Sequence, residues 1–190
     1  QHGEEMKFFL DSAKTDEIEY ALEMWNIDGV TTNPRHVLVS GKPFMKVIAE
    51  IAGIFDGTDK PISVEVNPHL DDWREMVTEG KKLAAMSPNF VIKLPATEPG
   101  FKAVYELAKD DIKSNLTLAF SAAQALQAMR MGAAFVSPFI FVDNALSQTT
   151  GREVYGWPKV AATVDAERTL WTDHPRLGVR LFTLRTKVFP

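Results

Sequence analysis

Residues 90–97 read FVIKLPAT, and this stretch decides how the rest of the chain is interpreted. A short apolar run that a proline ends is typical of a strand whose two faces are both covered by other parts of the protein. Lys93 interrupts this run at a position where an apolar side chain would pack better. The stretch therefore predicts a buried strand whose lysine points inward.

Similar strands alternate with helices along most of the chain. Short apolar runs predict strands at 7–11, 29–33, 62–66, 90–94, 112–119 and 134–141. Apolar residues at helical spacing predict helices at 15–25, 43–55, 70–86, 100–108 and 122–131. This alternation favours a parallel sheet with right-handed crossovers, and both an open doubly wound sheet and a closed (β/α)₈ barrel fit it. No glycine-rich phosphate loop follows the first strand, which disfavours the nucleotide-binding sheet.

Polar residues stand at the ends of the predicted strands, where an α/β barrel carries its functional side chains. They are Asp11, Thr32, Asn33, Glu65, Lys93, Asn115, Thr117 and Ser137. Burial lowers the pKa of an amine by desolvation, and a neutral amine attacks carbonyl carbons. The two acids are candidates for moving protons, and the amides and hydroxyls are candidates for binding substrate hydroxyls. The alternative is that Lys93 points inward only to pair with Glu65 or Asp11 for structural reasons.

The composition limits the remaining possibilities. The 190 residues are enough for one domain with a hydrophobic core, and 45% of them are hydrophobic. The net charge is -4 and no segment is strongly basic, so we expect neither a nucleic-acid nor a membrane partner. The absence of cysteine excludes disulfides and thiolate chemistry. We expect a cytoplasmic protein, because no apolar run has the length of a membrane span and no signal peptide is recognisable.

Two further features are predicted to have no catalytic role. His36 and His69 lie in predicted loops and match no metal-ligand spacing, so we expect surface histidines and no bound metal. Residues 1–5 are polar and precede the first strand, and we expect a disordered or artificially added terminus there.

Five motifs, in this order and spacing, closely resemble the transaldolase family, which includes the classical transaldolases and the small fructose-6-phosphate aldolases. They are KFFLDSA (7–13), DGVTTNP (28–34), ISVEV (62–66), FVIKLPAT (90–97) and IKSNLTLAFSAAQALQAMRMGAAFVSPF (112–139). The family fold is a (β/α)₈ barrel, so the resemblance favours the barrel over the open sheet. It implies a single barrel domain over residues 1–190 with a shortened or divergent C-terminal third.

The resemblance also implies the roles of individual residues. Lys93 matches the Schiff-base lysine, Asp11 the acid that aids proton transfer, and Thr117 the threonine that helps to hold a catalytic water. Glu65 matches the general acid/base that acts through water. The implied substrate-binding residues are Thr31, Asn33, Asn115, Ser137 and Phe139. No metal and no cofactor are implied.

Two positions separate the subtypes of this family. This chain has Glu65 and Phe139, and classical transaldolases have the same residue types at the matching positions. The fructose-6-phosphate aldolases have glutamine and tyrosine there, so the resemblance favours a transaldolase. The implied reaction is the transfer of dihydroxyacetone from sedoheptulose 7-phosphate to glyceraldehyde 3-phosphate, giving erythrose 4-phosphate and fructose 6-phosphate in the pentose phosphate pathway. An aldolase that uses free dihydroxyacetone, and a catalytically impaired barrel scaffold, remain alternatives.

The resemblance weakens after residue 139. Val142 and Asp165 stand where the family has two phosphate-binding arginines, and an acid repels phosphate. Residues 140–190 are therefore either a divergent, shortened barrel end or an altered sequence without native meaning, and one alternative is a substrate that lacks phosphate. Family members commonly assemble through a last helix that has no counterpart in this sequence, so a homo-oligomer is left open.

Overall fold

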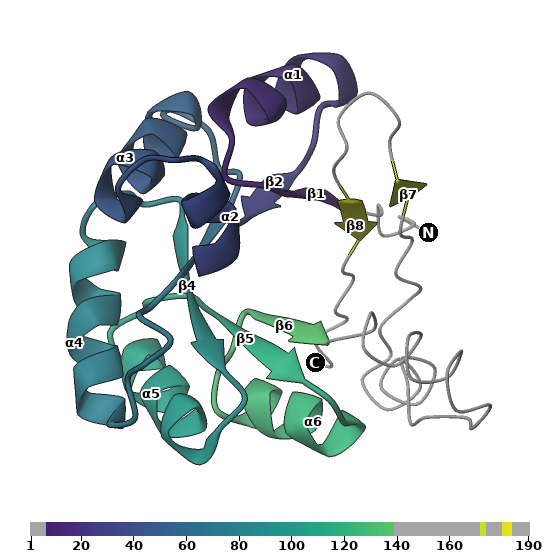
Figure 1. The fold of residues 1–190 in the computed structure, drawn as a ribbon. Coiled ribbons are helices and arrows are strands. Elements are labelled where there is room, and N and C mark those ends of the chain that lie inside the picture. The colour runs from purple at the N-terminus through teal and green to yellow at the C-terminus, as the bar shows by residue number, and fades with distance from the viewer. Residues whose placement is uncertain (1–6, 139–171, 174–179, 184–190) are drawn as a thin grey trace.

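Six parallel strands form one half of a barrel in the computed structural model, which describes residues 7–138, 172–173 and 180–183. The strands are β1 (Phe8–Asp11), β2 (Gly29–Thr31), β3 (Ile62–Glu65), β4 (Phe90–Pro95), β5 (Ser114–Ala119) and β6 (Phe135–Pro138), each paired with the next in chain order. The helices are α1 (Thr15–Trp25), α2 (Pro34–Val39), α3 (Phe44–Ile54), α4 (Trp73–Ala84), α5 (Glu98–Ala108) and α6 (Ala122–Arg130). Figure 1 shows the strands as an arc with α1, α3, α4, α5 and α6 along its outer side. This arrangement confirms the predicted α/β barrel class.

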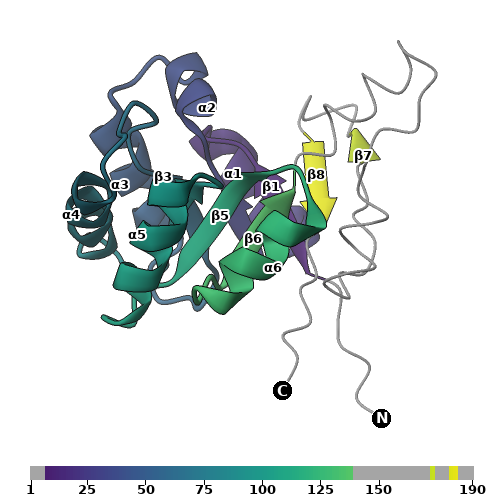
Figure 2. The ribbon, with the colours of Figure 1, turned by 90° about the horizontal axis from the view of Figure 1, so that it is seen from below.

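Two short strands extend the sheet beyond β1. They are β7 (Thr172–Asp173) and β8 (Arg180–Thr183), and the strand order is β6-β5-β4-β3-β2-β1-β8-β7. Strand β8 runs antiparallel to β1 and lies beside it (Figure 2), whereas all eight strands of a complete (β/α)₈ barrel are parallel. The predicted divergence of the C-terminal third agrees with this reversal. Phe139, Val142 and Asp165 lie outside the described residues.

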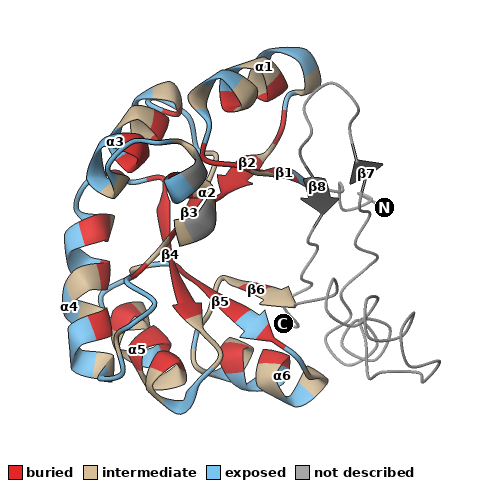
Figure 3. Ribbon diagram, viewed as in Figure 1, coloured by how far each residue is buried: buried red, intermediate tan, exposed pale blue. Residues whose placement is uncertain are grey.

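The main core fills the space between the strands and the outer helices. Side chains from both layers are completely buried there, among them Leu10, Ile18, Ile51, Ile92, Leu107 and Leu116. Figure 3 shows buried residues along the strands and exposed residues on the outward sides of the helices. Because successive side chains of a strand point to opposite faces, the residues that alternate with these core positions face the inside of the arc.

An aromatic contact crosses the inside of the arc. The ring of Phe9 in β1 meets the ring of Phe135 in β6 edge to face, with centroids 5.8 Å apart. Phe9 precedes Asp11 by two residues and Phe135 precedes Ser137 by two, so the ring pair lies beneath these polar strand ends. Gly29 leaves the room that the Phe9 ring occupies, since a Cβ there would lie 2.5 Å from Phe9 Cε1. The contact therefore joins the first and sixth strands below the candidate site.

Side-chain caps begin several helices directly after the strand ends. The Asn33 side chain accepts a hydrogen bond from the backbone N–H of His36, and Pro34 occupies the first helical position of α2. Thr97 caps α5 and Ser121 caps α6 in the same manner. Helix α2 is absent from the sequence-based expectation, in which Pro34 only ended a strand. Among the described residues, no helix combines the length and the hydropathy needed to cross a membrane.

Gly100 gives a direct test of how tightly α5 is seated behind β4. A Cβ at this position would lie 1.9 Å from the carbonyl oxygen of Pro95, which is backbone and cannot move away cheaply. We expect Gly100→Ala to lower the free energy of unfolding by about 3 kcal/mol. Gly53→Ala in α3 is the matched control, because among the described residues no atom apart from its chain neighbours and the nearby backbone of its own helix lies within 4 Å of its Cβ position. Gly53→Ala should raise the free energy of unfolding by about 0.5–1 kcal/mol, because alanine favours a helix more than glycine does. Urea unfolding of both variants measures the difference, and equal effects would contradict the close packing.

Candidate active site

Lys93 is buried inside the arc, with 7% of its surface exposed. It alternates along β4 with Ile92 and Leu94, which belong to the core between sheet and helices, so its side chain projects from the opposite face. The Nζ atom donates to the carbonyl oxygen of Thr32 at 3.1 Å and to Oγ1 of Thr31 at 3.4 Å. Both acceptors come from the end of β2, which is separated from β4 by β3, so this strand end holds the amine in one place from across the inside of the sheet.

Strand register places further polar residues on either side of Lys93. Glu65 of β3 is its partner on one side and Asn115 of β5 is its partner on the other. Because paired residues in adjacent strands project to the same face, the three side chains form one row across the inside of the sheet. The structure thus brings these three predicted site residues together, although only Glu65 ends its strand, and Lys93 and Asn115 lie within theirs.

A chain of hydrogen bonds fixes the Asn115 amide. Ser137 Oγ of β6 donates to Asn115 Oδ1 at 2.9 Å, and Asn115 Nδ2 donates to Ser63 Oγ of β3 at 3.0 Å. Ser63 was not among the residues singled out from the sequence. It precedes Glu65 by two positions, so the alternation of a strand would have placed both on the inner face. The amide is therefore held from both sides at the level of Lys93.

Thr117 lies next to this row, at an irregular point in the sheet. It is 3% exposed and pairs in register with Pro95 and Ser137. The pairing of β5 with β6 shifts between Thr117 and Ala119, and Leu118 between them has a φ of 60°, in the left-handed region. Bulges of this kind are frequent beside active sites, where they change the direction of a side chain. The irregular point therefore lies directly after Thr117 in the chain.

Asp11 is at the end of β1, in contact with the first turn of α2. Its Oδ1 atom lies 3.4 Å from Nδ1 of His36. The Asn33 amide nitrogen lies 3.2 Å from Nδ1 and 3.4 Å from Nε2 of the same ring. The prediction of a surface histidine in a loop is wrong for His36, because a short capped helix carries its half-buried ring to Asp11. The other histidine, His69, is exposed as predicted.

Comparison with known proteins matches the sequence of this chain to one family. The family model described as Transaldolase/Fructose-6-phosphate aldolase matches residues 8–161. The chain belongs to this family. It is 57% identical over 147 residues to the 6-deoxy-6-sulfo-D-fructose transaldolase of Priestia aryabhattai, covering 76% of this chain and 65% of the relative.

A second relative points to the same family. The chain is 48% identical over 135 residues to a probable transaldolase of Lachnoclostridium phytofermentans, covering 71% of this chain and 61% of that relative. The chain thus spans 65% and 61% of the length of these two curated relatives. Lys93, Glu65 and Asn115 all lie within the part of this transaldolase-family chain that the family model matches.

The charged groups of this transaldolase-family site influence one another. Burial raises the pKa of the Glu65 carboxyl above its usual 4.5, the positive charge of Lys93 lowers it, and the negative charge of Asp11 raises it further. The effect of burial is the largest of the three. The charges of Lys93 and Asp11 therefore both influence the pKa of Glu65. Its carboxyl retains a proton at higher pH than the carboxyl of an exposed glutamate does. In the described ranges, no group of three or more His, Asp or Glu side chains is placed to hold a metal ion.

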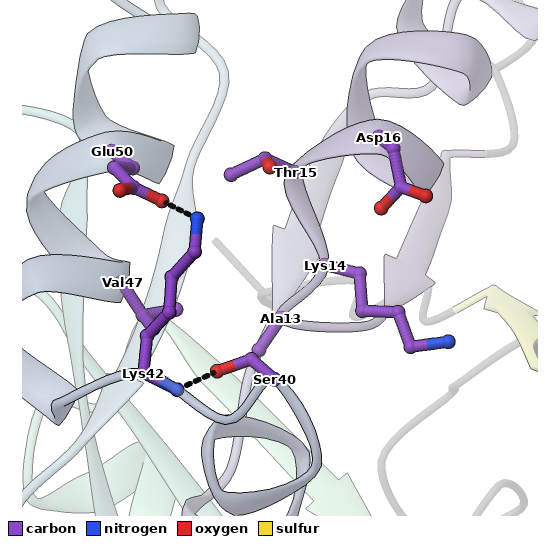
Figure 4. A pocket seen from close by; sticks show the side chains of 8 residues that line it. All are labelled: Ala13, Lys14, Thr15, Asp16, Ser40, Lys42, Val47 and Glu50. Atoms are coloured by element: carbon purple, nitrogen blue, oxygen red, sulfur yellow. Dashed lines mark hydrogen bonds and ion pairs between the residues drawn. The ribbon is translucent and has the colours of Figure 1, made fainter.

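A small surface pocket lies between α1 and α3, and Lys93 is not among the residues that line it. Its volume is about 190 Å³, and Figure 4 shows its lining, which comes from the start of α1, the segment after α2 and the side of α3. Lys42 at this pocket binds Glu50 at 2.6 Å, and Lys14 binds Glu17 at 2.9 Å. Because both lysines are already paired with carboxylates, the row formed by Glu65, Lys93 and Asn115 is the better candidate for an active site.

The raised pKa of Glu65 predicts a pH-dependent stability. A carboxyl whose folded-state pKa exceeds its unfolded value contributes stability that is complete below about 4.5 and is lost as pH rises through the folded pKa. Glu65→Gln removes this titration. The unfolding free energy of the variant relative to the wild type should therefore rise as the pH increases from 4.5 toward the raised pKa of folded Glu65. Urea unfolding at a series of pH values checks this, and a constant or falling difference would contradict it.

Proposed function

We propose that this chain is a transaldolase that transfers a dihydroxyacetone unit between sugars through a Schiff base on Lys93. The observation that carries the proposal is the buried Lys93 amine in register between Glu65 and Asn115. Membership of the family, and relatives whose names say transaldolase, support it. A buried amine next to proton-transfer groups suits attack on a ketose carbonyl.

The proposed reaction begins at the amine. Lys93 Nζ attacks the carbonyl carbon of the donor ketose, and loss of water from the resulting carbinolamine gives an imine. Glu65 supplies and recovers the protons of this dehydration through a water that Thr117 helps to hold. The raised pKa of Glu65 suits this role, because a general acid/base works best when its pKa approaches the working pH.

Cleavage and transfer follow on the same lysine. Asp11 takes the proton of the C4 hydroxyl, the C3–C4 bond breaks, and its electron pair enters the imine to form an enamine. The shortened aldose leaves. The enamine carbon then attacks the aldehyde carbon of an acceptor, whose oxygen takes up a proton, and hydrolysis of the new imine frees the product ketose and Lys93.

Other residues hold the three-carbon unit in place. The Asn115 amide is fixed by Ser63 and Ser137, so its remaining N–H presents a donor with a defined direction. We propose that it binds a substrate hydroxyl, with Ser137, Thr31 and Asn33 as further contacts. Such prior fixing lowers the entropy cost of binding and aligns the carbonyl with Lys93 Nζ.

Two classes of donor fit the proposal. One is a ketose phosphate, such as sedoheptulose 7-phosphate or fructose 6-phosphate, which would place the enzyme in the pentose phosphate pathway. The other is 6-deoxy-6-sulfo-D-fructose, favoured by the relative of that name, whose 57% identity exceeds the 48% of the probable transaldolase. Both classes present the same carbonyl and C4 hydroxyl to Lys93. We therefore propose the sulfonated ketose as the first donor to test. Action in the cytoplasm and assembly as a homo-oligomer stay predictions.

Borohydride reduction tests the lysine directly. Reduction in the presence of 6-deoxy-6-sulfo-D-fructose or fructose 6-phosphate should leave a three-carbon adduct on Lys93, identified by peptide mass spectrometry. Lys93→Met should lose the adduct and lower turnover by at least about 10³-fold. Lys82→Met on the exposed face of α4 is the matched control and should keep both. A folded wild-type protein that forms no adduct on any lysine would overturn the proposal.

Dependence on an acceptor separates transfer from simple cleavage. With the donor alone, a transaldolase retains the three-carbon unit on Lys93, so less than one equivalent of free dihydroxyacetone should appear in the first turnovers. Added glyceraldehyde 3-phosphate should restore continuous turnover, which a coupled assay of the released aldose measures. Steady release of dihydroxyacetone without acceptor would instead identify the aldolase alternative.

A further inference from the structure

His36 is a half-buried titratable group that the proposed reaction does not use. Helix α2 has only six residues, and the Asn33 cap and Pro34 place its first turn directly at the end of β2. From there the His36 ring reaches across to the end of β1, where its Nδ1 lies 3.4 Å from Asp11 Oδ1. The side chains are 29% and 23% exposed, so this contact is partly shielded from water.

The cap of α2 determines which side of Asn33 the ring meets. Asn33 Oδ1 accepts the backbone N–H of His36 at 2.9 Å, so the amide nitrogen is the end that faces the imidazole. That nitrogen is a donor and lies almost equally far from both ring nitrogens, at 3.2 and 3.4 Å. The ring thus contacts both a hydrogen-bond donor, the Asn33 amide, and the Asp11 carboxylate.

This geometry lets the His36 ring act as a donor toward Asp11 and as an acceptor from Asn33. With hydrogen on Nδ1, that nitrogen presents a donor to Asp11 Oδ1, and Nε2 accepts from the Asn33 amide. In this tautomer the ring links the acid of β1 to the amide that follows β2. The cap bond, the ring and the carboxylate therefore form one connected unit at the strand ends, beside the elements that hold Lys93 Nζ.

We infer that His36 is a positioning residue that orients the Asp11 carboxylate toward the C4 hydroxyl of the donor. The inference rests on the proposed function, in which Asp11 takes the proton during C3–C4 cleavage. A small misplacement of a proton-transfer group slows its step by one to two orders of magnitude while leaving other steps intact. Loss of the His36 contact should therefore slow cleavage and spare formation of the imine on Lys93.

The test follows the two adducts that borohydride traps on Lys93. His36→Phe keeps a ring of similar shape but removes both nitrogens, and His36→Gln keeps a donor and an acceptor. With the donor sugar alone, His36→Phe should shift the trapped population from the three-carbon adduct toward the intact six-carbon adduct. Its kcat should fall about 10- to 100-fold with little change in KM. His36→Gln should recover most of the kcat, which a merely space-filling role would not explain.

Controls separate this inference from a general loss of structure. His69→Leu changes the exposed histidine and should leave adduct ratio, kcat and melting temperature unchanged. If His36→Phe fails to fold, His36→Leu is tested in its place, and the His36→Gln variant is read by the same adduct ratio. An unchanged ratio and kcat in a folded His36→Phe overturns the positioning role. A raised KM with unchanged kcat also overturns it, because that result assigns His36 to substrate binding. Absence of any adduct on wild-type Lys93 overturns the proposed function itself.

Discussion

The burial of one amine is the constraint on which the arrangement of the site depends. An amine inside an apolar strand is tolerated only when polar groups meet it, and the carbonyl of Thr32 and the hydroxyl of Thr31 do so for Lys93. Those groups lie at the end of β2, which fixes how β2, β3 and β4 must be aligned. The same alignment sets Glu65 beside the lysine. The parallel half-barrel thus supplies the hydrogen bonds of Lys93 and its neighbours in one geometry.

Hydrogen bonds between side chains complete what the register begins. Ser63, Asn115 and Ser137 come from three strands, and their chain of two hydrogen bonds ties the inner faces of β3, β5 and β6 together. Each group in the chain has a partner, so none of these buried or half-buried polar groups carries the cost of being left without a hydrogen bond. The Ser114 hydroxyl, on the outer face of β5, differs from these groups. It is the one buried side-chain nitrogen or oxygen without a hydrogen bond among the described residues.

Much of this arrangement is readable from the sequence, and the failures have physical causes. Alternation within strands predicts that Lys93 and Glu65 face inward, because the period of two is strict. Helix α2 was missed because six residues are too few to show helical periodicity, and His36 was misplaced with it. The link from Asn115 to Ser63 depends on how far the sheet curves between β3 and β5, which no local pattern encodes. Phe139 and the expected phosphate positions lie outside the described residues, so their predicted roles stay predictions.

The contact between Phe9 and Phe135 has a consequence for the order of folding. These rings belong to the first and last of the six parallel strands, so their contact closes nearly the whole described parallel sheet. Contacts between residues so distant in sequence form late, because the entropy cost of closing the loop must first be offset by nearer pairings. On the ribosome, β1 and β2 can pair while later strands are still being made. The contact between the Phe9 and Phe135 rings, by contrast, cannot form until residue 135 has emerged. The site of this protein is therefore completed by one of the last parts of the half-barrel to be synthesised.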